Sequence, residues 1–217
     1  MVPTRRETSF REAMRSLLVF DGAMGSLLYE RGVFVTQNFE QLNVTRPDVV
    51  RKIHEDYVTA GAQVIETNTF GANCFRLDRH GLGDQVRAYN VAGARLAREA
   101  AAEDVWVAGS VGPSGLVPGV ATQAELDLAF LTFAEQAEAL VEGGADLLVL
   151  ETFRHLEEIR IALEQFAEYL FRIGDHCPEF QTAEHFAIAS HATMRVDGRA
   201  TLAPGQRHDH EHQRGCG

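Results

Sequence analysis

The sequence predicts an α/β fold built on a parallel sheet. Short apolar runs recur along the chain, and most lead directly into an acidic or glycine-rich turn. A strand that is apolar throughout is typical of a parallel sheet, whose two faces are both covered. The turns would then gather at the carboxyl edge of the sheet, where such folds place their functional residues. The expected strands are 17–20, 62–65, 105–108, 146–150 and, more weakly, 186–190.

Amphipathic segments between these runs predict the helices. Thr122 and Glu125 have the spacing of a capping box at a helix start, and Gly143 and Gly144 would end that helix. The strand-turn-helix-strand connections are short, so right-handed crossovers are expected. The expected helices are 4–15, 24–30, 45–60, 72–79, 84–102, 122–142 and 154–172.

The length of 217 residues, 45% of them hydrophobic, suits one domain with a sizeable core. A closed (β/α)8 barrel takes about 250 residues and eight strands. With about five parallel strands, the chain fits either the first portion of such a barrel or a smaller open sheet. Residues 206–217 contain no aliphatic or aromatic core residue. We therefore expect an incomplete barrel domain over 1–205 and a disordered, polar, histidine-rich tail over 206–217.

The composition excludes several classes of protein. A formal net charge of −11 argues against nucleic acid as a partner, because proteins that bind the phosphate backbone usually present a basic face. Three cysteines are too few, and odd in number, for a disulfide framework, which favours the cytoplasm. No apolar run approaches the roughly 18 residues of a membrane-spanning helix, and the first 16 residues lack the apolar core of a signal peptide. We expect a cytoplasmic protein that binds neither nucleic acid nor membrane.

Asp21 and Glu151 are the most informative acids, because each directly follows a predicted strand. Two carboxylates on one edge of a sheet could hold an ammonium group or perform acid–base chemistry. Alternatively, each could cap the following helix or bind a loop amide. Glu66 follows the second strand in the same way, and for it the two interpretations are equally supported. No catalytic residue is assigned.

Glycines follow Asp21 in the sequence, and polar residues follow Glu66. Gly22 and Gly25 could bring backbone N–H groups close to an anion, or could serve a tight turn with a positive φ angle, and both can hold together. Asn68 and Thr69 are possible rim residues, although ordering of their own loop is slightly favoured.

No spacing of histidines or cysteines marks a metal site. Cys74, Cys177 and Cys216 are dispersed, and Cys74 is expected to be a small buried residue. The alternating histidines of the tail could chelate a metal weakly, but a flexible tail without a preformed site is the favoured interpretation. We therefore assign no metal ligand.

Four motifs occur in order: LVFDGAMG at 18–25, ETNTF at 66–70, GSVGP at 109–113 and ETF at 151–153. Together with 140–146 and 198–206, they resemble the homocysteine S-methyltransferase family, most closely the N-terminal homocysteine-binding domain of the cobalamin-dependent methionine synthases. The resemblance implies a (β/α)8 barrel that transfers a methyl group to the sulfur of homocysteine, giving methionine. It also implies that Asp21 and Glu151 hold the amino end of homocysteine, with the backbone around Gly22 near its carboxylate.

The resemblance further implies a zinc ion, held by three cysteines, that binds homocysteine as a thiolate. In the family one cysteine follows the sixth strand and a pair follows the eighth, and none of the cysteines here lies in those motifs. We therefore expect a C-terminally truncated chain that lacks the zinc ligands and has little or no activity alone. The methyl donor is not predicted.

Two other interpretations remain open. One is a non-catalytic barrel fragment that persists by association with a complementing chain or with itself, since a partial barrel exposes strand edges. The other is a small open-sheet enzyme with Asp21 and Glu151 as acid and base.

Overall fold

The structure is a computed structural model that describes residues 8–34, 36–101, 103–117, 119–174 and 186–189. Its four strands form one sheet in the order β1-β2-β3-β4, with every neighbouring pair parallel. This confirms the predicted α/β fold with a parallel sheet, although the described strands form an open sheet and not a closed barrel. The strands are β1 (Val64–Glu66), β2 (Trp106–Val111), β3 (Leu147–Glu151) and β4 (Phe186–Ala189).

The first predicted strand, 17–20, is reduced to a single parallel bridge between Phe20 and Val64. Leu17 is 86% exposed and Val19 is 51% exposed, so the prediction that both faces of this segment are buried is wrong. The physical reason is its position at the edge of the sheet. β1 pairs with one side of the segment, and no other strand of the described residues pairs with its far side.

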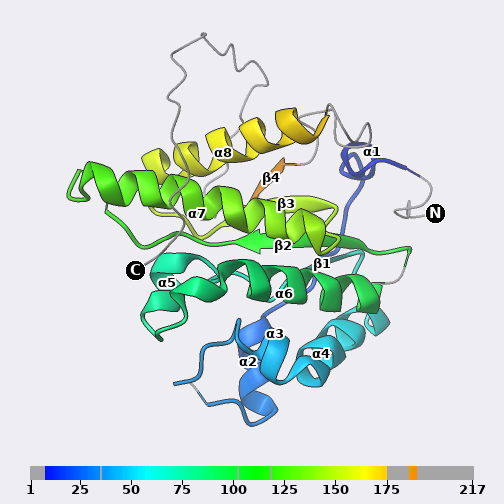
Figure 1. Ribbon diagram of the computed structural model, residues 1–217. Helices are drawn as coiled ribbons and strands as arrows, with labels where there is room; N and C mark the ends of the chain where they lie inside the picture. The colour runs from blue at the N-terminus through cyan, green and yellow to red at the C-terminus, as the bar shows by residue number, and fades with distance from the viewer. Residues whose placement is uncertain (1–7, 35, 102, 118, 175–185, 190–217) are drawn as a thin grey trace.

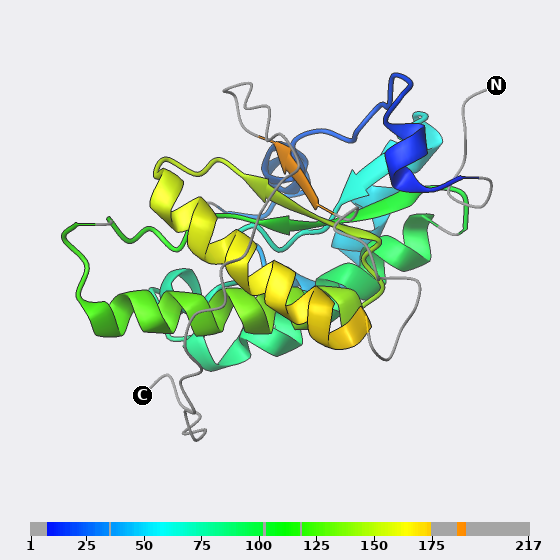
Figure 2. The same cartoon turned by 90° about the horizontal axis from the view of Figure 1, so that it is seen from above.

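Helices connect the strands, and Figures 1 and 2 show α6, α7 and α8 side by side against one face of the sheet. Figure 1 also shows α2, α3 and α4 grouped beside α6. The helices are α1 (Phe10–Ala13), α2 (Met24–Glu30), α3 (Leu42–Thr45), α4 (Pro47–Thr59), α5 (Cys74–Asp78), the 3-10 helix η1 (Gly83–Gln85), α6 (Val86–Ala101), α7 (Gln123–Glu142) and α8 (Leu156–Gly174).

Several helix predictions are confirmed closely and others need correction. The helix at 24–30 is present as expected, and Thr122 and Glu125 form the predicted capping box of α7. The leading helix is far shorter than 4–15, because Ser9 caps a helix of only four residues; residues 4–7 lie outside the described part. Thr45 does not start α4. It ends α3, where its hydroxyl donates to the carbonyl of Gln41 at 3.1 Å.

The strands present alternate side chains to the two faces of the sheet. On one face, Ile65 and Val107 belong to the core that α6, α7 and α8 cover. On the other, Val64 and Trp106 cluster with Phe10 of α1, whose ring lies edge-on to Trp106 with 5.4 Å between centroids. The second face is therefore covered at the amino end of the strands, which leaves its carboxyl end for the site described below.

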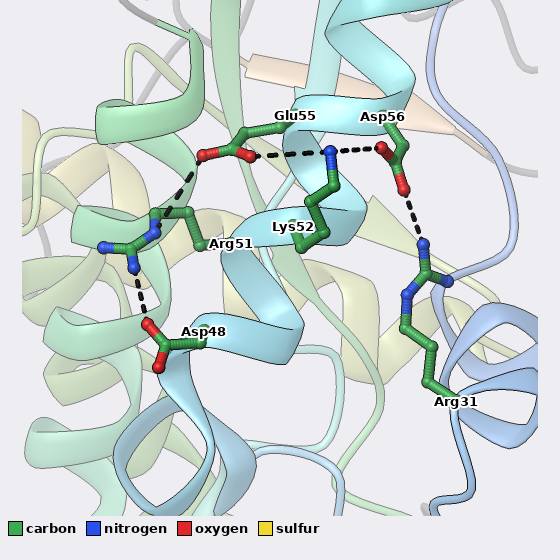
Figure 3. A network of polar contacts seen from close by, with 6 residues as sticks. All are labelled: Arg31, Asp48, Arg51, Lys52, Glu55 and Asp56. Atoms are coloured by element: carbon green, nitrogen blue, oxygen red, sulfur yellow. Dashed lines mark hydrogen bonds and ion pairs between the residues drawn. The ribbon is translucent and has the colours of Figure 1, made fainter.

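The outer surface of α4 carries a network of ion pairs (Figure 3). Lys52 Nζ lies 2.9 Å from Asp56 Oδ1, one helical turn away. Arg31, which follows α2, reaches the other oxygen of Asp56 at 2.5 Å and donates to the carbonyl of Leu27. Exposed pairs contribute little to stability individually. Their structural effect is to tie α2, the helix that follows the Asp21 turn, to α4.

Gly93 allows α6 to approach the loop that follows β1. A β-carbon on residue 93 would lie 2.6 Å from Asn43 Nδ2 and 2.7 Å from Thr69 Cγ2. We expect Gly93→Ala to lower the free energy of unfolding by about 1–3 kcal/mol through overpacking, although alanine is the better helix former. Denaturant unfolding measures the change. Gly25→Ala in α2 is the control, because its β-carbon would make only an ordinary 3.4 Å contact with Phe39; equal losses in the two variants would contradict the packing argument.

His54 on α4 is fully buried, and neither ring nitrogen has a hydrogen-bond partner in the described part of the chain. Burial lowers the pKa of His54 to about 4, since the charged form is disfavoured. The folded chain thus prefers neutral His54. The stability that neutral His54 preserves is fully present above its ordinary pKa near 6.5. It is lost as the pH falls toward the folded-state pKa of about 4.

We therefore expect wild-type stability to drop more steeply below pH 6.5 than that of His54→Leu, by roughly 3 kcal/mol at pH 4. Urea unfolding at several pH values measures the difference between the two proteins. A difference that does not change with pH would show that this histidine does not titrate on unfolding.

The end of the predicted 1–205 domain and the tail at 206–217 lie outside the described residues, so that division stays a prediction. Among the helices that the structure describes, none combines the length and apolar character needed to cross a membrane.

Candidate functional site

A cavity of about 310 Å³ lies at the carboxyl end of the sheet. Its walls are the turn at 21–24, the end of β1 with the loop that follows it at 66–70, Ser110 of β2, and Glu151, the last residue of β3. The cavity therefore gathers most of the candidate residues from the sequence, namely Asp21, Gly22, Glu66, Asn68, Thr69 and Glu151, whereas Gly25 does not line it. Their roles in binding stay predictions.

Strand periodicity explains why three of these residues meet. Glu66, Ser110 and Glu151 alternate with Ile65, Gly109 and Leu150, so they share the sheet face of Val64 and Trp106. The register pairs Ser110 with Val149, two residues before Glu151. The Ser110 hydroxyl donates a hydrogen bond to Glu151 Oε1, which fixes that carboxyl group toward β2.

Asp21 reaches the cavity from the edge of the sheet. Its Oδ2 accepts a 3.0 Å hydrogen bond from the Glu66 N–H, and its own N–H donates to the carbonyl of Val64 at 2.9 Å. The interpretation that Asp21 caps the following helix is wrong, because Ala23 is the N-cap of α2 and no side chain caps it. The carboxylate instead binds a backbone amide, as the alternative interpretation expected, but this amide belongs to the last residue of β1 and not to a loop.

The electrostatics of the cavity are those of crowded carboxyl groups. Burial, with a smaller repulsion from Glu151, raises the pKa of Asp21 to about 7, although the backbone N–H groups of Glu66 and Asp21 oppose the shift. Burial and then repulsion from Glu151 and Asp21 raise the pKa of Glu66 to about 8. Among the residues that the structure describes, no lysine, arginine or histidine lines the cavity. The cavity thus favours a cation.

Asn68 and Thr69 use their side chains to order the loop after β1. Asn68 Nδ2 donates to the carbonyl of Phe39 at 2.7 Å and to Asn43 Oδ1 at 2.9 Å. The Thr69 hydroxyl donates to the carbonyl of Ser110 at 2.8 Å. These contacts agree with the loop-ordering interpretation and place both residues in the support of the cavity.

Neither Gly22 nor Gly25 has a positive φ angle, so the interpretation based on a left-handed turn is wrong for both. Gly22 instead lies close to a side chain of α4. A β-carbon on residue 22 would lie 2.9 Å from the Tyr57 hydroxyl oxygen, and this hydroxyl donates to the carbonyl of Ala23 at 3.3 Å. Among the non-glycine residues that the structure describes, Thr152, next to Glu151, has a positive φ angle of 59°. A β-branched residue in that conformation is strained, and such strain clusters at functional sites.

The sequence reasoning missed the residues that support the acids. Ser110 was foreseeable, because it is a polar side chain in an apolar strand and shares the parity of the buried face. Asn43 and Glu158 support the surrounding loops, and nothing in the sequence next to them predicted this role. Buried Asn43 donates to the carbonyl of Asn68 at 2.8 Å, and Glu158 of α8 accepts from the Ser114 N–H at 2.7 Å. Both contacts join segments at least 25 residues apart.

The described residues do not fit a thiolate zinc site. No group of three or more histidine, cysteine or acidic residues in the described ranges has a geometry that would hold a metal ion. Cys74 is buried at the start of α5, as expected, and its N–H is hydrogen bonded to the Thr132 hydroxyl at 3.0 Å. Cys177 and Cys216 lie outside the described residues.

Comparison with known proteins identifies the family. The family model for homocysteine S-methyltransferase matches residues 18–208. The chain belongs to this family. Methionine synthase of Mycobacterium tuberculosis is 33% identical over 193 residues, which cover 82% of this chain and 16% of that protein; the Mycobacterium leprae protein is 32% identical over 191 residues, covering 82% and 15%. The chain thus spans about a sixth of the length of these curated relatives.

Solved homocysteine methyltransferases share the fold. The oxidized form of MmuM from Escherichia coli superposes with a TM-score of 0.60 at 31% identity, covering 70% of this chain and 59% of that one. Its metallated form gives a TM-score of 0.62 at 29% identity, covering 73% and 62%. This chain therefore carries an α/β segment that matches part of each of these structures.

Proposed function

We propose that this chain is a homocysteine S-methyltransferase-type protein that supplies the amino-acid-binding part of the site within an incomplete (β/α)8 barrel. The observation that carries the proposal is the convergence of Asp21, Glu66 and Glu151 on one cavity, to which the described part of the chain contributes no basic side chain. An ammonium group has three donors and matches such acceptors, and hydrogen bonds between charged groups are the strong ones.

The roles proposed for the residues follow from their geometry. Asp21 and Glu151 accept hydrogen bonds from the ammonium group of homocysteine, each held in place by a donor of its own. The backbone at Gly22, in the wall formed by 21–24, lies beside the substrate carboxylate. No step of methyl transfer is assigned, since the described residues do not fit the family's zinc site. The methyl donor is likewise not assigned.

Isothermal titration of the 217-residue chain with homocysteine tests the proposal. We expect saturable binding, and a loss of binding with 4-mercaptobutyrate, which keeps the thiol and carboxylate but lacks the ammonium group. A parallel assay of homocysteine methylation with added zinc and a methyl donor should show little or no product. Equal affinity for the two thiols would contradict the proposed role of the acids, and robust turnover by the chain alone would contradict the proposed incompleteness.

A second candidate is a non-catalytic barrel fragment that acts or persists by association. It is favoured by the exposed edge of the sheet, where Leu17 is 86% exposed and Val19 is 51% exposed. Apolar sheet edges of this kind promote pairing with another chain. Size exclusion with light scattering tests this candidate, because a chain that stays monomeric and soluble over a wide concentration range needs no such association.

A further inference from the structure

The three carboxyl groups of the cavity differ in how they are hydrogen bonded. Asp21 accepts from the Glu66 N–H at 3.0 Å, and Glu151 accepts from the Ser110 hydroxyl. Within the described residues, no donor reaches the carboxyl group of Glu66. An anion is stabilised by donors directed at it, so Glu66 is the member of the trio least suited to carry a negative charge.

Charge balance leads to the same residue. Three ionised carboxyl groups would place three negative charges around about 310 Å³, and the described lining residues include no basic side chain. Within the described ranges, Tyr57 is a further titratable group next to the trio; it lies against Gly22 and is affected by the charge of Asp21. One ammonium group supplies a single positive charge, and an amino acid also brings its own carboxylate. Adjacent buried carboxylates of this kind retain a proton on one member.

Building on the proposed amino-acid site, we propose that Glu66 is an uncharged carboxylic acid that donates a hydrogen bond in the cavity, while Asp21 and Glu151 are the anions that hold the ammonium group. This arrangement makes Glu66 a specificity determinant. An anionic Glu66 would repel the carboxylate of a zwitterionic ligand and favour simple amines, whereas a neutral Glu66 admits an amino acid.

The upward shift in the pKa of Glu66 agrees with this assignment. Burial raises the pKa of Glu66 to about 8, which is above the value of about 7 for Asp21. At pH 7 Glu66 is therefore mostly protonated. Repulsion from Glu151 contributes more to the shift at Glu66 than repulsion from Asp21 does, and this order can be measured.

Nuclear magnetic resonance of the ligand-free chain, labelled with ¹³C at glutamate carboxyl groups, tests the assignment directly. The Glu66 signal is identified by its loss in Glu66→Gln. We expect its titration midpoint near pH 8. Glu151→Gln should lower the midpoint, and Asp21→Asn should lower it less. The control Glu157→Gln, an exposed position at the start of α8, should leave it in place. A midpoint near 4.5, the ordinary value, or one insensitive to Glu151→Gln, overturns the proposal.

Homocysteine binding supplies a second readout. Glutamine is close in shape to a neutral glutamic acid, so Glu66→Gln should retain affinity within about threefold at pH 7, whereas Glu66→Ala should lose about tenfold. A loss in Glu66→Gln as large as in Asp21→Asn overturns the proposal, because it would show that the charge is required. If wild-type chain fails to bind homocysteine, the proposed function fails, while the titration midpoint still decides the state of Glu66.

Discussion

Replacing Glu151 by glutamine should lower the affinity of the chain for homocysteine by about 10- to 100-fold at pH 7. The substitution preserves size and removes the charge, so the ammonium group loses a charge-assisted hydrogen bond. The Ser110 hydroxyl can still donate to the amide oxygen, which keeps the side chain in place. Titration calorimetry measures the change, with the exposed Glu157→Gln as control; equal affinities in wild type and Glu151→Gln would rule out this carboxylate as a ligand for the amine.

The same site should respond to pH through Asp21. Its pKa of about 7 means that protonation competes with the ammonium group as the pH falls. We expect wild-type affinity to fall below pH 7, approaching a tenfold loss per pH unit where Asp21 is mostly protonated. Asp21→Asn should bind weakly and with a much flatter pH profile. Parallel profiles in the two proteins would assign the pH dependence to another group.

Phe133→Ala should be among the most destabilising single substitutions in the described chain, at about 3–5 kcal/mol. Phe133 of α7 is fully buried in the core between the sheet and its helices. The centroid of its ring lies 6.0 Å from that of Phe153. Removal of the ring leaves a cavity that the close-packed neighbours can fill only in part. The free energy of unfolding of a whole domain is about 5–15 kcal/mol, so this loss could unfold a large fraction of the molecules.

Denaturant unfolding measures this loss, and Leu131→Ala two residues away is the matched control. Leu131 is 60% exposed, so its truncation should change stability by no more than about 0.5 kcal/mol. Similar losses at both positions would mean that α7 does not bury the face that contains Phe133. Because Phe153 lies two residues after Glu151, Phe133→Ala should also weaken homocysteine binding in the molecules that remain folded.

Much of the fold was determined by short-range pattern in the sequence. Apolar runs that lead into acidic or glycine-rich turns predicted β1, β2 and β3, since a strand covered on both faces is mostly apolar. The capping box of Thr122 and Glu125 marked the start of α7, because capping depends on residues three positions apart. The same logic placed Asp21, Glu66 and Glu151 at one edge of the sheet, where the cavity gathers them.

Tertiary structure decided what depends on residues far apart in the chain. The exposure of Leu17 reflects an edge with a partner on only one side, which no local pattern reveals. Gly93 packs closely against Asn43 and Thr69, and Gly22 lies against the Tyr57 ring, whereas neither glycine has a positive φ angle. The three carboxyl groups also differ in their hydrogen bonds because of residues far away in sequence. Folding brings the Ser110 hydroxyl to Glu151, 41 residues away, and the Glu66 N–H to Asp21, 45 residues away. Among the described residues, no donor reaches the carboxyl group of Glu66.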